Sequence, residues 1–174
     1  RLHLFAGLSG RGKSWWLLNL AKQAMLHGKK VLFITCEMSE EEVMQRTMQN
    51  RFAITKRPQD VVRPILQKKD GEFQALATKT LKRPSLEDEG IKTSLHKRLS
   101  NSKKNKMVVR YFPAGELSVR GLEAYLDVLE TSDKFIPDLI LLDYMDLMEV
   151  DSDNLRQSLN QMTINLKGLA MKRS

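Results

Sequence analysis

A glycine-rich octapeptide near the start of the sequence has the residue types that bind nucleotide phosphates. Gly7-Leu8-Ser9-Gly10-Arg11-Gly12-Lys13-Ser14 fits the pattern G-x-x-x-x-G-K-[ST] at every constrained position. The glycines allow the backbone to wrap closely and to point its N–H groups at phosphate oxygens. Lys13 supplies a cation for the β- and γ-phosphates, and the Ser14 hydroxyl is a ligand for Mg²⁺. We therefore expect residues 7–14 to hold the phosphates of ATP.

Two carboxylates follow apolar segments of strand length elsewhere in the chain. Asp143 comes directly after Leu139–Leu142, where it can hold Mg²⁺ beside Ser14. Glu37 comes just after Val31–Thr35, where it can orient or deprotonate a water that attacks the γ-phosphate. Without further information, Asp143 can also be a turn residue, and Glu37 a surface acid that precedes a helix cap.

These residues need a sheet and helices to position them, and the hydrophobic pattern predicts both. Strand-like segments alternate with segments of helical periodicity, which is typical of an α/β fold with a mainly parallel sheet. Ligands of such folds bind at the carboxyl ends of the strands, where the candidate residues fall. The expected strands are Leu2–Ala6, Val31–Thr35, Met107–Phe112 and Leu139–Leu142. The expected helices are Lys13–His27, Ser39 to about Ala53, one that begins at Ser118, and Leu155–Lys172.

Individual residues mark several of these boundaries. Gly28 is expected to end the first helix in a left-handed conformation. Ser39 and Glu42 form a capping box for the second helix. Of the two tryptophans that follow the glycine-rich loop, Trp16 is predicted to lie in the core, whereas Trp15 is a candidate for the nucleotide site or an interface.

Residues 56–106 differ from the rest of the chain because they are polar and rich in charge. Three prolines interrupt them, so we expect short helices joined by loops. The chain has 29 basic and 21 acidic residues, a net charge of +8, and much of the excess lies between Lys79 and Lys106. This excess favours a polyanionic partner such as nucleic acid, but a solvated surface insertion explains it equally well.

Length and composition limit the class of protein. A chain of 174 residues is expected to form a single domain with a real core. No apolar run approaches the roughly 20 residues that span a bilayer. Cys36 is the single cysteine and can form no internal disulfide, which favours a cytosolic protein without a membrane partner.

Three segments together resemble the motor domain of DnaB-type replicative helicases. They are Gly7–Ser14, then Phe33–Ser39 with Arg46, and then Pro137–Met148 with its aspartate-tyrosine pair. Asn165–Ala170 is similar to the helix that follows in that family. The resemblance covers most of the chain outside residues 56–106, and the spacing would suit a phage relative.

The resemblance implies a RecA-like P-loop NTPase core with a charged helical insertion. It implies that Lys13 and Ser14 bind phosphate and Mg²⁺, that Glu37 is the catalytic base and that Asp143 is the Walker B aspartate. It leaves the role of Arg46 open. Such motors are hexameric rings that hydrolyse ATP between subunits and move on single-stranded DNA in the cytoplasm of a bacterial or phage-infected cell. A primase and a helicase loader are candidate partners.

Two departures from the family pattern bear on the motor. Asp146 stands where the family usually has a glutamine that helps to sense nucleotide state. The family also has an amino-terminal domain, a further strand, DNA-binding loops and a basic finger that reaches the neighbouring subunit. We find none of these, and expect the sequence to be a fragment. The polar segment Glu149–Asn154 falls where DNA-facing loops often lie, but its acids make it a poor contact for phosphate.

Three other functions use the same phosphate loop. A recombinase or helicase-loading ATPase would assemble on DNA without unwinding it. A small-molecule kinase would have a second substrate pocket and no response to DNA, and the Glu37 and Asp143 motifs argue against it. A nucleotide-binding assembly protein without turnover would not need an intact set of Lys13, Ser14, Glu37 and Asp143.

Overall fold

The protein forms two compact units in a computed structural model. The structure describes residues 1–8, 10–69, 72–100, 107–149 and 154–173. The first unit combines residues 1–47 with 104–174, and the second consists of residues 48–103.

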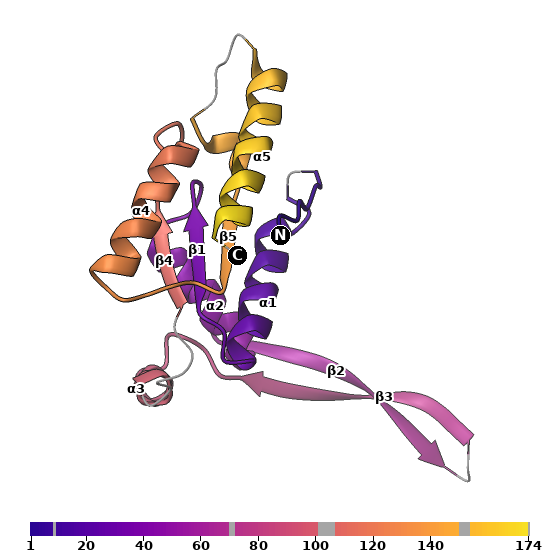
Figure 1. Cartoon of the computed structure of the whole chain (residues 1–174). Helices are drawn as coiled ribbons and strands as arrows, with labels where there is room; N and C mark the ends of the chain where they lie inside the picture. The colour runs from indigo at the N-terminus through magenta and orange to yellow at the C-terminus, as the bar shows by residue number, and fades with distance from the viewer. Residues whose placement is uncertain (9, 70–71, 101–106, 150–153, 174) are drawn as a thin grey trace. The chain divides into compact units, whose positions relative to one another are not determined.

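The first unit is built on a parallel sheet of three strands (Figure 1). The strands are β1 (Val31–Thr35), β4 (Met107–Tyr111) and β5 (Leu139–Asp143), in the order β4-β1-β5. The register pairs Thr35 with Tyr111 on one side and with Asp143 on the other. The carboxyl ends of the three strands therefore meet along one edge, as the predicted parallel sheet requires.

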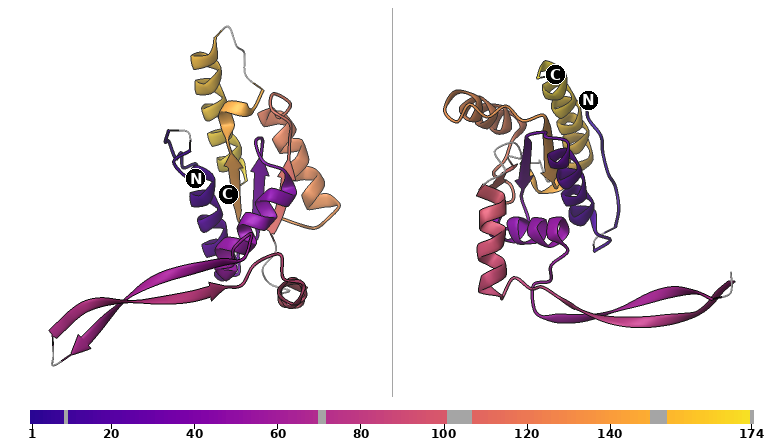
Figure 2. Two further views of the ribbon diagram at one scale, coloured as in Figure 1. Left: turned by 180° about the vertical axis from the view of Figure 1, so that it is seen from behind. Right: turned by 90° about the horizontal axis from the view of Figure 1, so that it is seen from below.

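Four helices cover the two faces of this sheet, which gives three layers (Figure 2). On one face, α1 (Lys13–Leu26) and α2 (Glu40–Phe52) pack against alternate residues of β1. On the other, α4 (Val119–Thr131) and α5 (Leu155–Lys172) pack against the remaining ones. The first core contains Leu18, Ala21, Met25, Val31, Phe33, Met38, Val43 and Leu141. The second contains, among others, Leu32, Ile34, Cys36, Leu122, Leu126, Leu129, Met162, Leu166 and Leu169. The predicted α/β fold with flanking helices is confirmed.

The residues that mark the helix ends behave as their chemistry dictates. After α1, Gly28 has a φ of 73°, and its N–H bonds to Met25 O at 3.0 Å while that of Lys29 bonds to Ala24 O at 3.0 Å. These are the bonds of a left-handed helix stop. Ser39 Oγ accepts the N–H of Glu42 at 3.2 Å, so it caps α2 as predicted. Ser118 caps α4 through Gly121 N in the same way, at 3.1 Å.

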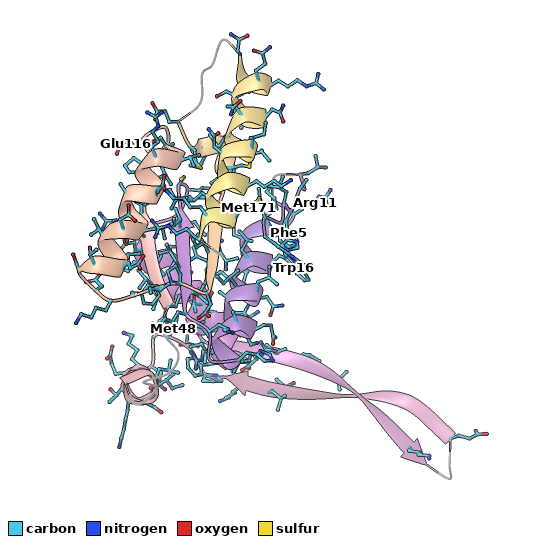
Figure 3. The ribbon with its side chains drawn as sticks, in the orientation of Figure 1. Phe5, Arg11, Trp16, Met48, Glu116 and Met171 are labelled. Atoms are coloured by element: carbon cyan, nitrogen blue, oxygen red, sulfur yellow. The ribbon has the colours of Figure 1, made fainter. Side chains whose placement is uncertain are left out.

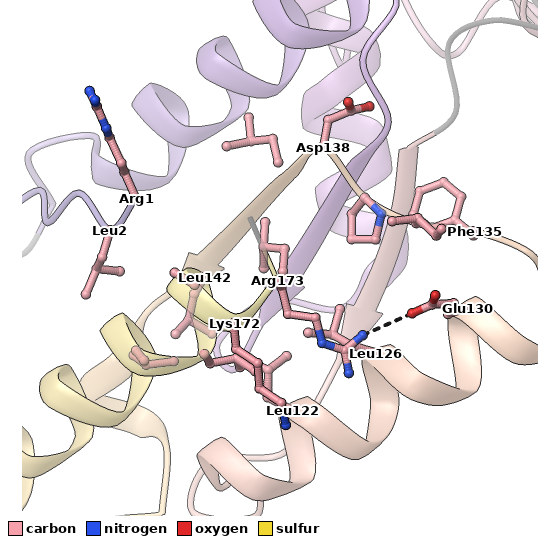
Figure 4. A pocket seen from close by; sticks show the side chains of 17 residues that line it. Arg1, Leu2, Leu122, Leu126, Glu130, Phe135, Asp138, Leu142, Lys172 and Arg173 are labelled. Carbon is pink, nitrogen blue, oxygen red and sulfur yellow. Dashed lines mark hydrogen bonds and ion pairs between the residues drawn. The ribbon is translucent and has the colours of Figure 1, made fainter.

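The segment Leu2–Ala6 does not form the strand that its short apolar sequence predicts. Its side chains and those of β5 instead line a cavity of about 650 Å³. An extended segment becomes a strand only when its backbone pairs with a neighbour, and local alternation does not specify that pairing. A second cavity, of about 480 Å³, lies between β5, α4 and α5, and the ion pair of Arg173 with Glu130 lies beside it (Figure 4).

The second unit differs most from its predicted form. In place of short helices and loops, it contains a long antiparallel pair, β2 (Gln59–Lys69) and β3 (Glu72–Arg83), followed by the single helix α3 (Glu89–Ser100). Pro64, one of the three prolines expected to interrupt regular structure, lies inside β2 opposite Thr78. A two-stranded ribbon has an outer edge on each strand, where a residue without an N–H is tolerated.

The short 3-10 helix η1 (Met145–Leu147) follows β5. Most of the predicted polar loop, at residues 150–153, lies outside the described residues. None of the described helices is long and apolar enough to cross a membrane.

Candidate nucleotide-binding site

The glycine-rich loop wraps around the amino-terminal end of α1. Gly10 and Gly12 have φ values of 72° and 84°, in the left-handed region that favours glycine. Gly12 is also the N-cap of α1 and offers no side chain to the first N–H groups of the helix. These N–H groups are therefore available to an anion, as is common at helix amino-termini. Ser9 lies outside the described residues.

The Lys13 side chain folds back over this loop. Its Nζ donates to Gly7 O at 2.7 Å and to Leu8 O at 3.3 Å. The same ammonium lies 5.9 Å from the centre of the Tyr144 ring, within reach of a cation–π contact. The Lys13 ammonium thus lies between the loop carbonyl groups and Tyr144, which follows the end of β5.

Asp143 ends β5 beneath the loop and is almost completely buried, with 1% of its surface exposed. Within the described residues, neither of its carboxylate oxygens has a hydrogen-bond partner. Burial raises the pKa of this carboxyl, and the nearby Ser14 hydroxyl, Arg46 and Lys13 only partly oppose the rise. A buried carboxylate without a partner is costly, so this position suits a group that binds a cation.

Glu37 lies beside Asp143, because β1 and β5 end next to each other. Cys36, the residue before Glu37, donates its N–H to Asp143 O at 2.8 Å. Thr35 Oγ1 accepts the N–H of Met38 at 2.9 Å and that of Glu37 at 3.3 Å, which fixes the turn after β1. The Glu37 side chain itself is exposed to solvent. Loop, aspartate and glutamate are thus all found at the same edge of the sheet.

Tyr144 has a more central place than its position in a sequence motif suggested. Burial raises the pKa of its hydroxyl, and the charges of Glu37, Asp146 and Asp143 raise it further. Its ring also faces Lys13. The aspartate-tyrosine pair was the only feature of the sequence that pointed to Tyr144. It did not indicate that Tyr144 lies near both Lys13 and the acids. Asp146 lies in η1 and is exposed.

Arg46 of α2 reaches the site from the side of the loop. Its guanidinium lies 5.7 Å from the centre of the Trp15 ring and forms an ion pair with Glu42 at 2.7 Å. It also lowers the pKa of Asp143 electrostatically. Trp15 directly follows Ser14, so the arginine contacts the first turn of the phosphate-binding helix.

The prediction that Trp16 is a core residue is wrong, because 52% of its surface is exposed. The buried face of α1 contains Leu18, Ala21 and Met25, which excludes the position of Trp16. Trp16 instead makes an edge-to-face contact with Phe5 at 6.4 Å (Figure 3). Both line a hollow of about 690 Å³ beside the loop.

A glycine-rich loop that opens a helix, beside two acids at the ends of neighbouring parallel strands, defines the P-loop NTPase class. Comparison with protein families narrows this class, since residues 1–173 match the DnaB-like helicase C terminal domain. The chain belongs to this family and is the ATPase motor domain of a DnaB-like replicative helicase. A search of curated proteins gives no match to the chain.

Proposed function

We propose that this motor domain binds MgATP at residues 7–14 and hydrolyses it to move along single-stranded DNA. One observation carries the proposal. The buried carboxylate of Asp143, with both oxygens unpartnered, lies beside the two loop residues Lys13 and Ser14. A cation bound there would satisfy the buried charge, and a triphosphate in the loop would bring that cation with it.

The loop would bind the phosphates mainly through backbone groups. The left-handed conformations of Gly10 and Gly12 and the uncapped start of α1 support this assignment. The Lys13 ammonium now donates to two carbonyl oxygens of its own loop. A short movement would transfer those hydrogen bonds to β- and γ-phosphate oxygens, which are stronger acceptors because they are charged.

Ser14 and Asp143 would hold Mg²⁺, with phosphate oxygens and water as the remaining ligands. The residues fit the ion, since hard oxygen donors are the ligands that Mg²⁺ prefers. When bound, Mg²⁺ would neutralise charge that develops on the transferred phosphoryl group. Ser14, Arg46 and Lys13 favour the ionised form of Asp143, although burial raises its pKa overall.

Glu37 would orient the attacking water and accept its proton. Its exposed carboxylate stands at the strand end next to Asp143, on the turn that Thr35 fixes. Exposure suits this role because a general base must be reached by water. The hydrolytic step then depends on Glu37, whereas binding depends on Lys13 and Ser14.

The assembly around this site belongs to the same proposal. We place the site at a subunit boundary of a hexameric ring in the cytoplasm of a bacterial or phage-infected cell, with a primase or a helicase loader as candidate partners. Membership of the DnaB-like family supports ring assembly and DNA binding in general. A RecA-like recombinase or helicase-loading ATPase is the second candidate and differs in not unwinding duplex DNA.

The test is ATP hydrolysis with and without single-stranded DNA, for the wild type and for Glu37→Gln. We expect DNA to stimulate turnover in the wild type. Glu37→Gln should lower turnover by about 10²-fold or more, as loss of a general base does, and leave ATP binding intact. Glu41→Gln, an exposed acid of α2, is the matched control. Turnover that ignores DNA, or that survives Glu37→Gln, would contradict the proposal.

A further inference from the structure

Nearly all of the net positive charge belongs to the second unit. Residues 48–103 contain 13 basic and 6 acidic residues, whereas the first unit contains 16 and 15. The first unit also balances its charges locally, through ion pairs such as Lys29 with Asp138 and Arg110 with Glu40. The two units therefore offer very different electrostatic surfaces to a polyanion.

The described acids of α3 and its cap are already engaged within the second unit. Glu89 forms an ion pair with Lys92 at 2.6 Å. Asp88 caps α3 by accepting the N–H groups of Gly90 at 2.9 Å and Ile91 at 3.2 Å. By contrast, four exposed cations at the base of the ribbon have no carboxylate within ion-pair distance in the described part of the chain. They are Lys56, Arg57, Lys82 and Arg83.

We name residues 56–83 the basic arm. It contains eight basic and three acidic residues, and its two strands form a long twisted ribbon (Figure 1). The register places Arg63 directly opposite Lys79, and Lys68 and Lys69 lie at the far end of β2.

The arm is anchored within its own unit by an ordered base. Thr55 N donates to Pro84 O at 3.0 Å, and Leu86 N donates to Thr55 O at 2.9 Å. Ser85, between these partners, is buried. Lys82 and Arg83 thus lie in the paired strand β3, and Lys56 and Arg57 lie between the bonded Thr55 and the start of β2.

The length and composition of the arm indicate which polyanion it fits. Eleven residues of strand span about 36 Å, close to one turn of a DNA duplex at roughly 34–36 Å. A two-stranded ribbon also fits the major groove of a duplex. Phe73 is the only aromatic residue between positions 56 and 106, so the arm lacks the row of aromatic side chains that stacks on single-stranded bases.

We propose that the basic arm binds the phosphodiester backbone of duplex DNA without reading its sequence. This contact goes beyond the proposed motor function, because it uses no residue of the nucleotide site. The arm would then give the domain a duplex-binding site that is separate from the site that acts on single-stranded DNA.

The test is fluorescence anisotropy of a labelled blunt duplex of about two helical turns, titrated with the full chain at several salt concentrations. Lys82→Gln with Arg83→Gln should weaken binding about tenfold. The slope of log affinity against log salt should fall by about 1.8, which corresponds to two lost phosphate contacts. Arg63→Gln with Lys79→Gln should act in the same way without touching the base of the arm. Circular dichroism checks that each variant is folded.

Matched controls separate this contact from general charge and from the motor. Arg120→Gln with Lys167→Gln removes two exposed cations from the first unit and should leave duplex binding unchanged. Glu37→Gln should also leave it unchanged, so failure of the motor proposal and failure of this one are distinguishable.

Three results would overturn the proposal. The first is an arm variant that binds duplex with the affinity and salt slope of the wild type. The second is a control double variant that loses as much duplex affinity as the arm double variants. The third is that the arm variants bind duplex normally but no longer self-associate at high protein concentration. The arm, with its exposed Val62 and Leu81, would then be a protein contact.

Discussion

We propose that the phosphate loop and the basic arm both bind phosphate groups, but they use different chemical groups to do so. The loop uses glycine backbone, a helix end and the ammonium group of its one lysine, Lys13. The arm uses eight basic side chains on and beside a two-stranded ribbon. Binding by oriented N–H groups depends on geometry, whereas binding by many cations depends on their number and on displaced counterions. The two regions should therefore respond differently to substitution and to salt.

The largest expected difference follows from Lys13→Ala. The loop has one lysine, so removing it should lower ATP turnover by about 10³-fold, in the range known for single charge-stabilising groups. The basic arm should bind duplex as before. Turnover and duplex anisotropy measured on the same preparation check this prediction. A parallel loss of both activities would show that the two regions are not independent.

Added salt should weaken duplex binding by the arm by about two orders of magnitude and ATP binding by the loop much less. If the arm makes four phosphate contacts, raising salt from about 50 to 200 mM should weaken duplex binding about 10²-fold. ATP affinity should change only a few-fold, because the loop binds through a fixed, partly enclosed geometry that salt screens less. Titrations of labelled duplex and labelled nucleotide across this range test the comparison. Equal slopes would contradict it.

Asp143→Asn should stabilise the ligand-free protein, because it removes a buried charge from the first unit. The pKa of Asp143 is raised by burial, so its ionised form destabilises the ligand-free fold above the pKa of the unfolded chain. This penalty is absent at low pH, grows as pH rises above the pKa of the unfolded chain, and is fully present once pH exceeds the raised pKa. The asparagine should therefore stabilise the ligand-free protein by about 1–3 kcal/mol at neutral pH. Thermal unfolding with and without MgATP measures this gain.

The same variant should gain little or nothing further from MgATP, whereas the wild type should be stabilised by it. Ser118→Ala, which removes the cap of α4, should lower stability without removing the response to MgATP. An Asp143→Asn protein that is less stable than the wild type at neutral pH would count against the buried unpaired charge.

The smallest expected effect concerns Arg46. Its contact with Trp15 is worth about 0.5–1 kcal/mol, so Arg46→Ala should weaken ATP binding only a few-fold. In a Trp16→Phe background the emission comes from Trp15 alone, and the substitution should also shift that emission. Arg120→Ala serves as the control. An unchanged spectrum would place Arg46 away from the ring in solution.

The sequence was sufficient for elements whose signals are local. The helix stop at Gly28, the caps at Ser39 and Ser118 and the apolar strands β1 and β5 all follow from a few neighbouring residues. The placement of Glu37 beside Asp143 then followed from the rule that parallel strands end at one edge.

Elements that depend on contacts between residues distant in the sequence were predicted wrongly. The ribbon β2–β3 pairs residues up to 24 positions apart, and Pro64 is tolerated there only because both strands are edges. Leu2–Ala6 has the length and apolar character of a strand but no partner in the described sheet. Trp16 fits an apolar helical spacing, yet the face of α1 that packs is turned away from it. Tyr144 and the contact of Arg46 with Trp15 required the fold itself.

The single cysteine gives the site a built-in reporter of its own opening. Cys36 is 3% exposed, and burial followed by the charge of Asp143 raises its pKa. A thiol reagent can modify it only when the end of β1 separates from its neighbours, because both access and the thiolate form are suppressed in the closed state. The rate of modification therefore measures how often the closed core beneath Glu37 opens. Protection by nucleotide would measure how far ligand binding extends the lifetime of the closed state.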